Sequence, residues 1–293
     1  MLDKVYEPIL PPTIHEADPR ADLLDVEQKM YDDVLQHFSD PTYSLPGIEE
    51  KGELTEAEKF WLSRECLLRY LRAVKWKTTK AAIQRLEATL KWRREYGLYD
   101  VVSANHVEPE VRNKNFLVKS TLALLINYGD KAKNPSLGVA RTVLNILQDH
   151  YPERLGVALI LNVPFLLNAF YKLINPFIDP VSREKMKFNP RVIEDNLFTP
   201  DMVISEWWGG DCDFEYVHDK YWPALLNLCE SRRKAFLEKW RVLGGTVGLK
   251  EWEYKGRGTT SVIHPDPQAA DIEKVVDAPV QVDVSPSAYP LAA

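Results

Sequence analysis

Residues Tyr151–Lys187 read YPERLGVALILNVPFLLNAFYKLINPFIDPVSREKMK, and this stretch decides how the rest of the chain is interpreted. It begins with a charged turn that contains Glu153 and continues into a short apolar strand at 158–161. Residues 163–178 follow with Lys172 as their only charge, and the stretch ends in a charged cluster. The pattern is that of an apolar segment held between two polar turns.

The apolar segment is too short to be a convincing membrane span. As one continuous helix it would rise only about 24 Å at ~1.5 Å per residue, whereas the hydrocarbon core of a bilayer is about 30 Å thick. A helix that is apolar nearly all round must be covered on more than one side. It is therefore either a core helix or a cover for something apolar that is not always protein. Its large side chains are Phe165, Leu166, Phe170, Leu173, Ile174, Phe177 and Ile178.

The composition is that of a soluble globular protein. The 293 residues are 45% apolar and 27% charged, and a chain of this length can bury a substantial core. The N-terminal residues lack the basic-then-apolar layout of a signal peptide. Cys66, Cys212 and Cys229 are widely spaced, without a CxxC motif. This favours a reducing compartment, and we expect a cytoplasmic protein.

Charge is distributed unevenly along the chain. Residues 1–56 carry a net charge of −10, residues 57–256 carry +7, and residues 257–293 carry −3. A mildly basic central body could favour an anionic surface or headgroup. Alternatively, the basic residues are simply spread over a solvated surface.

Periodicity and breakers predict a helical half followed by an α/β half. Helices are expected at 21–38, 55–74, 79–96, 139–150 and 223–242, and strands at 121–128, 158–161 and 186–189. Thr55 and Glu58 have the spacing of a capping box, and Gly97 is a typical helix stop. Strands that alternate with helices indicate an α/β sheet, preceded here by a helical module.

Several motifs occur in an order that is similar to one known family. They are LLRYLRAVKW at 67–76, KWRREYG at 91–97, YPERLG at 151–156, and the NVPF…INPFIDP run at 162–180. Together they resemble the CRAL-TRIO lipid-binding family, and most closely its fungal phosphatidylinositol-transfer branch. The resemblance covers residues 25–255.

The resemblance implies a fold and a domain organisation. The fold class is α/β, with a mixed sheet floor, helices and one large apolar pocket for a single lipid, preceded by a helical N-terminal tripod. The expected parts are a flexible arm at 1–20, the helical module at 21–100, the lipid-binding domain at 101–255, and a disordered acidic tail at 256–293. The apolar helix at 164–178 would be the gate of the pocket, with its seven large side chains facing lipid tails.

The resemblance also implies a headgroup site. Glu153 of the PER turn and Lys185 would hold the headgroup, Ser182 stands where family members carry Ser or Thr, and Asp179 would cap the next helix. A carboxylate can accept hydrogen bonds from inositol hydroxyls, and a lysine supplies charge and donors to a phosphodiester. Amides at a helix N-terminus could help to bind phosphate. The alternative is a surface turn in which Glu153 pairs with Arg154 and Lys185 is a solvated lysine.

One interval is shorter than the family pattern requires. Only residues 98–120 lie between the KWRREYG helix and the strand at 121–128, a shortfall on the order of two supersecondary units of ~30 residues each. The shortfall indicates an internal deletion, a splice variant or a faulty gene model. For the chain as written, we expect an internally truncated lipid-binding domain with an unpaired strand edge and part of the pocket wall absent. Two hypotheses follow: binding and intermembrane transfer of phosphatidylinositol, or a transfer-deficient isoform or interaction protein.

Motifs of catalysis are not found in the sequence. It contains no GxSxG, P-loop or HExxH pattern, and its histidines show no metal-ligand spacing. Its aromatic residues are not interleaved with a basic stripe, so nucleic acid is not an expected partner. We expect no enzyme activity, no catalytic or metal-binding residue, and no cofactor apart from phospholipid as cargo. The expected protein is a monomer that touches intracellular membranes transiently.

Overall fold

The computed structural model describes residues 4–9, 22–48, 52–100, 103, 123–127, 137–154, 157–161 and 185–255. The expected acidic tail at 256–293 and the expected gate helix at 164–178 lie outside these residues. Within the described part, no helix is long and apolar enough to cross a membrane.

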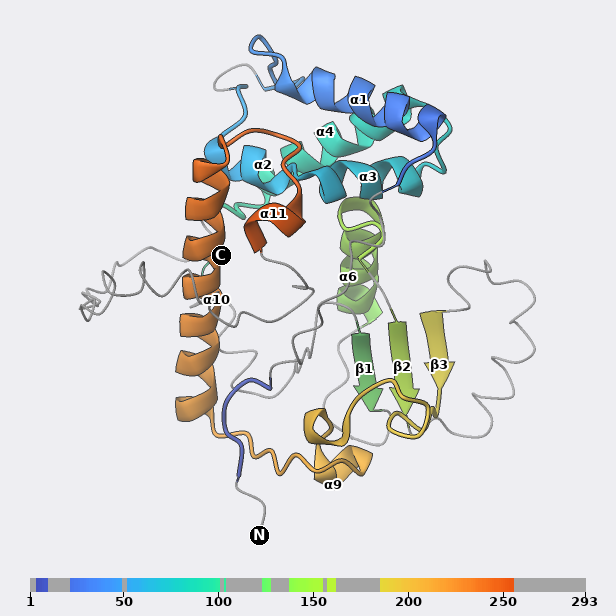
Figure 1. The fold of residues 1–293 in the computed structure, drawn as a ribbon, viewed down its shortest axis with the longest axis vertical. Coiled ribbons are helices and arrows are strands. Elements are labelled where there is room, and N and C mark those ends of the chain that lie inside the picture. Colours follow the sequence, from blue (N-terminus) through green and yellow to red (C-terminus); the bar gives the residue numbers. More distant parts are fainter. Residues whose placement is uncertain are drawn as a thin grey trace, which may run out of the picture. The chain divides into compact units, whose positions relative to one another are not determined.

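Helices α1 (Asp25–Ser39), α2 (Glu56–Trp61), α3 (Arg64–Ala73) and α4 (Thr79–Glu95) form an N-terminal module. Helices α1, α3 and α4 pack against one another (Figure 1). Their contact surfaces are lined by large aliphatic and aromatic side chains, each of which contributes about 1.5–3 kcal/mol when fully buried. Buried members of this core include Val34, Phe38, Leu67, Leu68, Leu71, Leu86 and Leu90, together with Leu62 at the end of α2. This module has its own hydrophobic core.

The prediction of one continuous helix at 55–74 is wrong, because this segment forms two helices, α2 and α3. Ser63 stands at the break, and its Oγ accepts a hydrogen bond from the Cys66 amide at 3.1 Å as the N-cap of α3. The backbone groups on either side bond to the C-terminal segment instead: Leu62 O accepts from Gly248 N at 2.8 Å, and Arg64 N donates to Leu249 O at 3.0 Å. The sequence gives no local sign of these distant partners.

In the described part of the chain, three parallel strands follow in the order β1-β2-β3. They are β1 (Ala123–Asn127), β2 (Val157–Leu161) and β3 (Met186–Phe188), and α6 (Leu137–His150) lies between β1 and β2 in the chain. Parallel neighbours require such a crossover connection. The alternation of strands and helix confirms the predicted α/β character (Figure 1).

The sheet passes into a loop region and then into a long helix. A 3-10 turn, η2 (Pro200–Met202), and a short helix, α9 (Ser205–Trp208), follow β3. Leu159 of β2 is buried against Val192 and Val203 from this region. Helix α10 (His218–Val242) begins five residues before the predicted start at Pro223.

The C-terminal residues of the described chain return to the N-terminal module. Trp240 of α10 contacts Phe60 with ring centroids 5.6 Å apart, and Val247 belongs to the same core as α1, α3 and α4. A short helix that was not predicted, α11 (Glu251–Lys255), buries Tyr254, which also contacts Phe60. The helical module is therefore completed by residues that the predicted domain organisation assigns to the lipid-binding domain.

Part of the expected N-terminal arm is held by the same chain. Val5 N donates to Asp213 O at 2.8 Å, and Glu215 N donates to Val5 O at 3.0 Å. The Lys220 ammonium lies 3.6 Å from the centroid of the Tyr6 ring. Residues 4–9 thus contact residues 213–220, and the flexible arm expected over 1–20 stays a prediction.

Candidate functional site

The fold explains why Glu153 and Lys185 meet. Glu153 lies in the turn before β2, and Lys185 directly precedes β3. Because β2 and β3 are parallel neighbours, with Ala158 paired to Met186, their N-terminal ends lie at the same edge of the sheet. Two residues that are far apart in the sequence are thereby brought together.

The two charged groups form a loose ion pair. The Lys185 Nζ lies 3.8 Å from the Glu153 Oε2, and the two side chains are 25% and 35% exposed. This distance exceeds the 2.7–3.2 Å of a protein hydrogen bond, and a partly exposed pair of this kind contributes only about 0.2–1 kcal/mol to stability. The carboxylate and the ammonium therefore retain hydrogen-bonding capacity for a ligand.

The turn that carries Glu153 has an unusual backbone conformation. Glu153 has a φ of +58°, in the left-handed region, which costs about 1–2 kcal/mol for a residue other than glycine. The preceding Pro152 is buried. Such a conformation persists only where the surrounding structure holds it.

A second group of charges, partly buried, lies where α11 meets α3. Glu251 accepts hydrogen bonds from the Ser63 hydroxyl at 2.6 Å and from Lys255 at 2.6 Å, and the Arg69 guanidinium lies 3.5 Å away. Burial acts to raise the pKa of Glu251, but the charges of Lys255 and Arg69 and the hydrogen bonds from Lys255 and Ser63 outweigh it and lower the pKa to about 2. The sequence pattern did not reveal this cluster, because α11 returns to α3 from the other end of the described chain.

The remaining predicted site residues cannot be placed. Asp179, Ser182 and the predicted gate side chains all lie outside the described residues. Those gate side chains are Phe165, Leu166, Phe170, Leu173, Ile174, Phe177 and Ile178. Their roles stay predictions.

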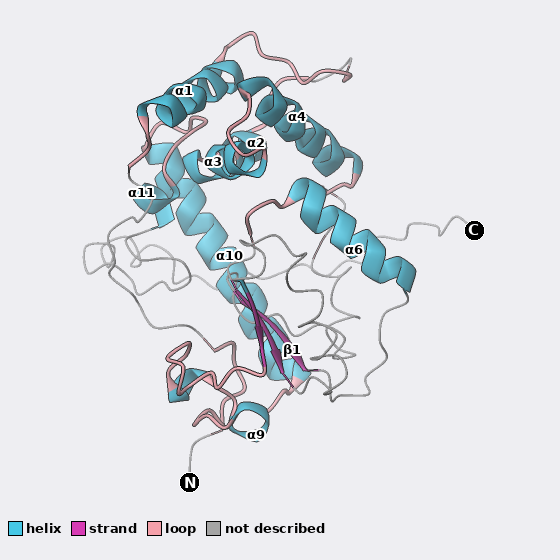
Figure 2. Ribbon diagram, turned by 90° about the vertical axis from the view of Figure 1, so that its right-hand side faces the viewer, coloured by secondary structure: helices cyan, strands magenta, loops and turns pink. Residues whose placement is uncertain are grey.

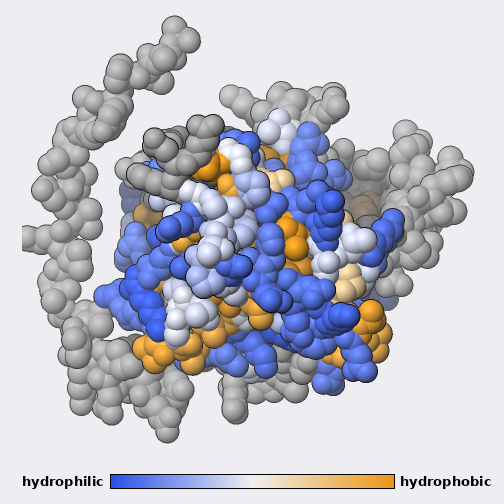
Figure 3. All heavy atoms as spheres, turned by 90° about the horizontal axis from the view of Figure 1, so that it is seen from above, coloured by the Kyte–Doolittle hydropathy of each residue, from blue (hydrophilic) through white to orange (hydrophobic). Residues whose placement is uncertain are grey.

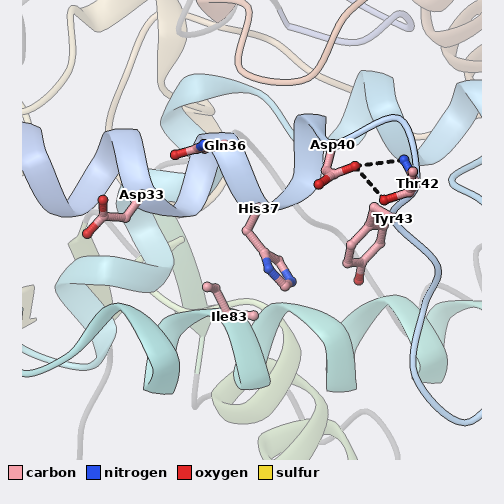
Figure 4. A pocket seen from close by; sticks show the side chains of 7 residues that line it. All are labelled: Asp33, Gln36, His37, Asp40, Thr42, Tyr43 and Ile83. Atoms are coloured by element: carbon pink, nitrogen blue, oxygen red, sulfur yellow. Dashed lines mark hydrogen bonds between the residues drawn. The ribbon is translucent and has the colours of Figure 1, made fainter.

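A surface pocket lies on the helical module, and the residues that line it are far in the sequence from Glu153 and Lys185. Figure 4 shows it between α1, the loop that follows, and α4, with His37 and Tyr43 side by side and Asp40 turned to Thr42. Asp40 accepts from the Thr42 amide and hydroxyl at 2.7 Å each. Ile83 is the large aliphatic side chain of a lining that is otherwise polar or aromatic. The pocket is not suited to an acyl chain.

The outer face of this module is also polar. Seen from above, the described surface is mostly hydrophilic with scattered apolar patches (Figure 3). Among the exposed apolar side chains are Leu24, the N-cap residue of α1, and Val26 of α1, at 69% and 63%. Within the described ranges, no group of acidic, histidine and cysteine side chains could hold a metal ion.

Comparisons with known proteins decide the family. The model of the CRAL/TRIO domain matches residues 103–207, and that of the CRAL/TRIO N-terminal domain matches residues 30–88. The phosphatidylinositol transfer protein PDR17 of Saccharomyces cerevisiae is 30% identical over an alignment that covers 87% of this chain and 90% of that protein. The chain belongs to the CRAL-TRIO family. Membership in this lipid-binding family confirms the predicted fold class.

Other CRAL-TRIO relatives are similar over different extents. A CRAL-TRIO domain-containing protein of Schizosaccharomyces pombe is 38% identical over 82% of this chain, but the chain spans only 28% of that protein. A solved structure described as the crystal structure of Sfh5 covers 75% of this chain and 99% of its own, with 15% identity and a TM-score of 0.40. This structural similarity is too low to support a conclusion about the chain.

The PDR17 alignment also bears on the short interval in the sequence. It extends over 324 positions, whereas 87% of the 293 residues is about 255, so about 70 positions hold residues of the relative alone. This surplus is similar in size to the segment that the sequence analysis expects to be missing from this CRAL-TRIO chain.

Proposed function

We propose that this protein binds phosphatidylinositol and transfers it between membranes. The observation that carries the proposal is the Glu153–Lys185 ion pair, whose groups lie 3.8 Å apart at one edge of the sheet. Membership in the CRAL-TRIO family supports it, and so does the similarity to PDR17, which is named a phosphatidylinositol transfer protein.

The chemistry of the pair matches the chemistry of that headgroup. The Glu153 carboxylate can accept hydrogen bonds from inositol hydroxyls, and the Lys185 ammonium can donate to the phosphodiester. A loose pair is suited to this exchange, because its members lose little mutual stabilisation when each turns to the ligand. Transfer breaks no covalent bond, so the proposed function requires neither a catalytic residue nor a cofactor.

The same proposal gives roles to the chain between β2 and β3. Asp179 and Ser182 would complete the headgroup site with Lys185. The apolar residues of 164–178 would contact acyl chains when the site is closed and the bilayer when it is open, since such a surface meets lipid in either state. The protein would act as a monomer in the cytoplasm, with transient contact at intracellular membranes.

Substitution of Lys185 tests the headgroup assignment. Charge-assisted hydrogen bonds contribute about 1.5–3 kcal/mol, so Lys185→Ala should lower the rate of phosphatidylinositol transfer between vesicles by about tenfold or more. Lys185→Arg, which retains the positive charge, should keep a larger part of the activity. Arg191→Ala is the matched control, because Arg191 is a cation that follows β3, past the end opposite to Lys185, and its side chain is 76% exposed.

Two results would count against these ideas in different ways. Full phosphatidylinositol transfer by the Lys185→Ala protein contradicts the role of the pair. A wild-type protein that carries no lipid and transfers none contradicts the proposed function and supports the alternative of a transfer-deficient chain.

A further inference from the structure

The C-terminal end of α6 is capped by side chains of the N-terminal module. The last carbonyl groups of a helix have no partner within the helix. Here Arg85 of α4 donates to the carbonyls of Gln148 and Asp149, and the Tyr70 hydroxyl of α3 donates to His150 O at 2.8 Å. Figure 2 shows α6 ending beside these helices. Side chains of α3 and α4 therefore bind the last carbonyl groups of α6.

The side chain of His150 is fixed by the same helices. Its ring stacks on Trp92 with centroids 4.1 Å apart and planes 6° from parallel. Its Nδ1 lies 3.2 Å from the Thr89 hydroxyl oxygen, which in turn lies 2.9 Å from the Tyr70 hydroxyl oxygen. Tyr70 and Thr89 are 1% and 0% exposed, so their two hydroxyls are closed to solvent, whereas His150 is half-buried. Burial lowers the pKa of His150, which favours the neutral ring on the stack.

The next residue toward Glu153 is held as well. The Tyr151 hydroxyl accepts a hydrogen bond from Arg93 Nη1 at 3.4 Å, and its ring meets the edge of Trp92 with centroids 6.0 Å apart and planes at 89°. Trp92 thus contacts two consecutive residues, and buried Pro152 follows them directly. Glu153, whose backbone is in the left-handed conformation, is the residue directly after Pro152.

We propose that Trp92 is a positioning residue for the headgroup site, which it serves by fixing the 150–154 turn so that Glu153 faces Lys185. The inference rests on the proposed function and assigns Trp92 no contact with lipid. A strained turn that loses its supports populates other conformations. Apparent affinity then falls in proportion to the fraction of molecules that remain competent to bind.

Three variants of the full chain separate positioning from stability. Trp92→Ala removes the stack, Trp92→Phe keeps an aromatic ring, and Leu86→Ala creates a cavity at a fully buried position of the same helix. Leu86 belongs to the hydrophobic core that α1, α3 and α4 share, so Leu86→Ala should lower the melting temperature through a cavity in that core. The readouts are the ratio of phosphatidylinositol to phosphatidylcholine transfer between vesicles and the amide hydrogen exchange of residues 150–154.

The expected pattern is specific to positioning. If Trp92→Ala lowers the competent fraction to about a tenth, the transfer ratio falls about tenfold, and exchange at 150–154 speeds up. Trp92→Phe and Leu86→Ala should both keep the wild-type ratio. A Leu86→Ala protein that loses the ratio as strongly as Trp92→Ala would overturn the inference, because general destabilisation would then explain the loss.

The remaining outcomes distinguish the inference from the function beneath it. A selective wild type together with an equally selective Trp92→Ala protein contradicts the positioning role alone. A wild type without any preference for phosphatidylinositol contradicts the proposed function, and the positioning role is then overturned with it.

Discussion

At the scale of single residues, two glutamates show the difference between a structural and a binding carboxylate. Glu58 is fully buried, and its oxygens accept from Thr55 N at 2.8 Å and from Arg94 Nε and Nη2 at 2.6 and 2.7 Å. These contacts occupy the acceptor positions of Glu58 and leave little for a ligand. Glu153 has a long contact with Lys185 and remains partly exposed. The comparison favours Glu153 as the residue that can exchange partners.

The pH dependence of stability should report on Glu251. Its pKa of about 2 lies below the ordinary value of 4.5, so its contribution is present above pH 4.5 and is lost as the pH falls toward 2. Between pH 6 and pH 3, Glu251→Gln should lose about 2 kcal/mol less stability than the wild type. Urea unfolding at both pH values measures this difference. Exposed Glu253→Gln is the control, and an equal effect there would contradict the assignment.

At the scale of elements, the junction between the C-terminal segment and the helical module depends on one glycine. Gly248 has a φ of +81°, and an added Cβ would lie 2.3 Å from Leu35 Cδ1 and 3.2 Å from the Tyr31 hydroxyl. Gly248→Ala combines backbone strain with overpacking, which should destabilise the protein by about 2–4 kcal/mol. Chemical denaturation measures the loss.

Gly244 provides the matched control for that substitution. It also has a positive φ, +107°, but nothing lies within 4 Å of an added Cβ. Gly244→Ala should therefore cost only the backbone strain, about 1 kcal/mol. Equal losses for the two variants would show that close packing at Gly248 does not matter.

Elements with local signals could be predicted from the sequence, and those with distant causes could not. The capping box of Thr55 and Glu58 and the end of α4 before Gly97 depend on neighbouring residues, and both are confirmed. The break at Ser63 depends on backbone partners at Gly248 and Leu249. The contacts of Val5 and the packing of α11 likewise need residues from far along the chain.

At the scale of the whole molecule, the same distinction applies to the candidate site. Glu153 and Lys185 were selected from motifs, and the parallel order of β2 and β3 explains why they meet. The contact between Trp92 and the 150–154 turn could not be predicted, although Trp92 lies in the KWRREYG motif and Tyr151 in the YPERLG motif. A sequence motif identifies the individual residues, but Trp92 meets His150 and Tyr151 only because α6 packs on α4.

The central question for the whole molecule is whether this chain carries a lipid, given that about 70 positions of the PDR17 alignment have no counterpart in it. Native mass spectrometry of the full chain, purified without detergent, answers it most directly. We predict a one-to-one complex with the mass of phosphatidylinositol in the wild type and loss of that species in Lys185→Ala. A wild-type protein that is detected only at its lipid-free mass would contradict the account. So would a Lys185→Ala protein that carries phosphatidylinositol as well as the wild type does.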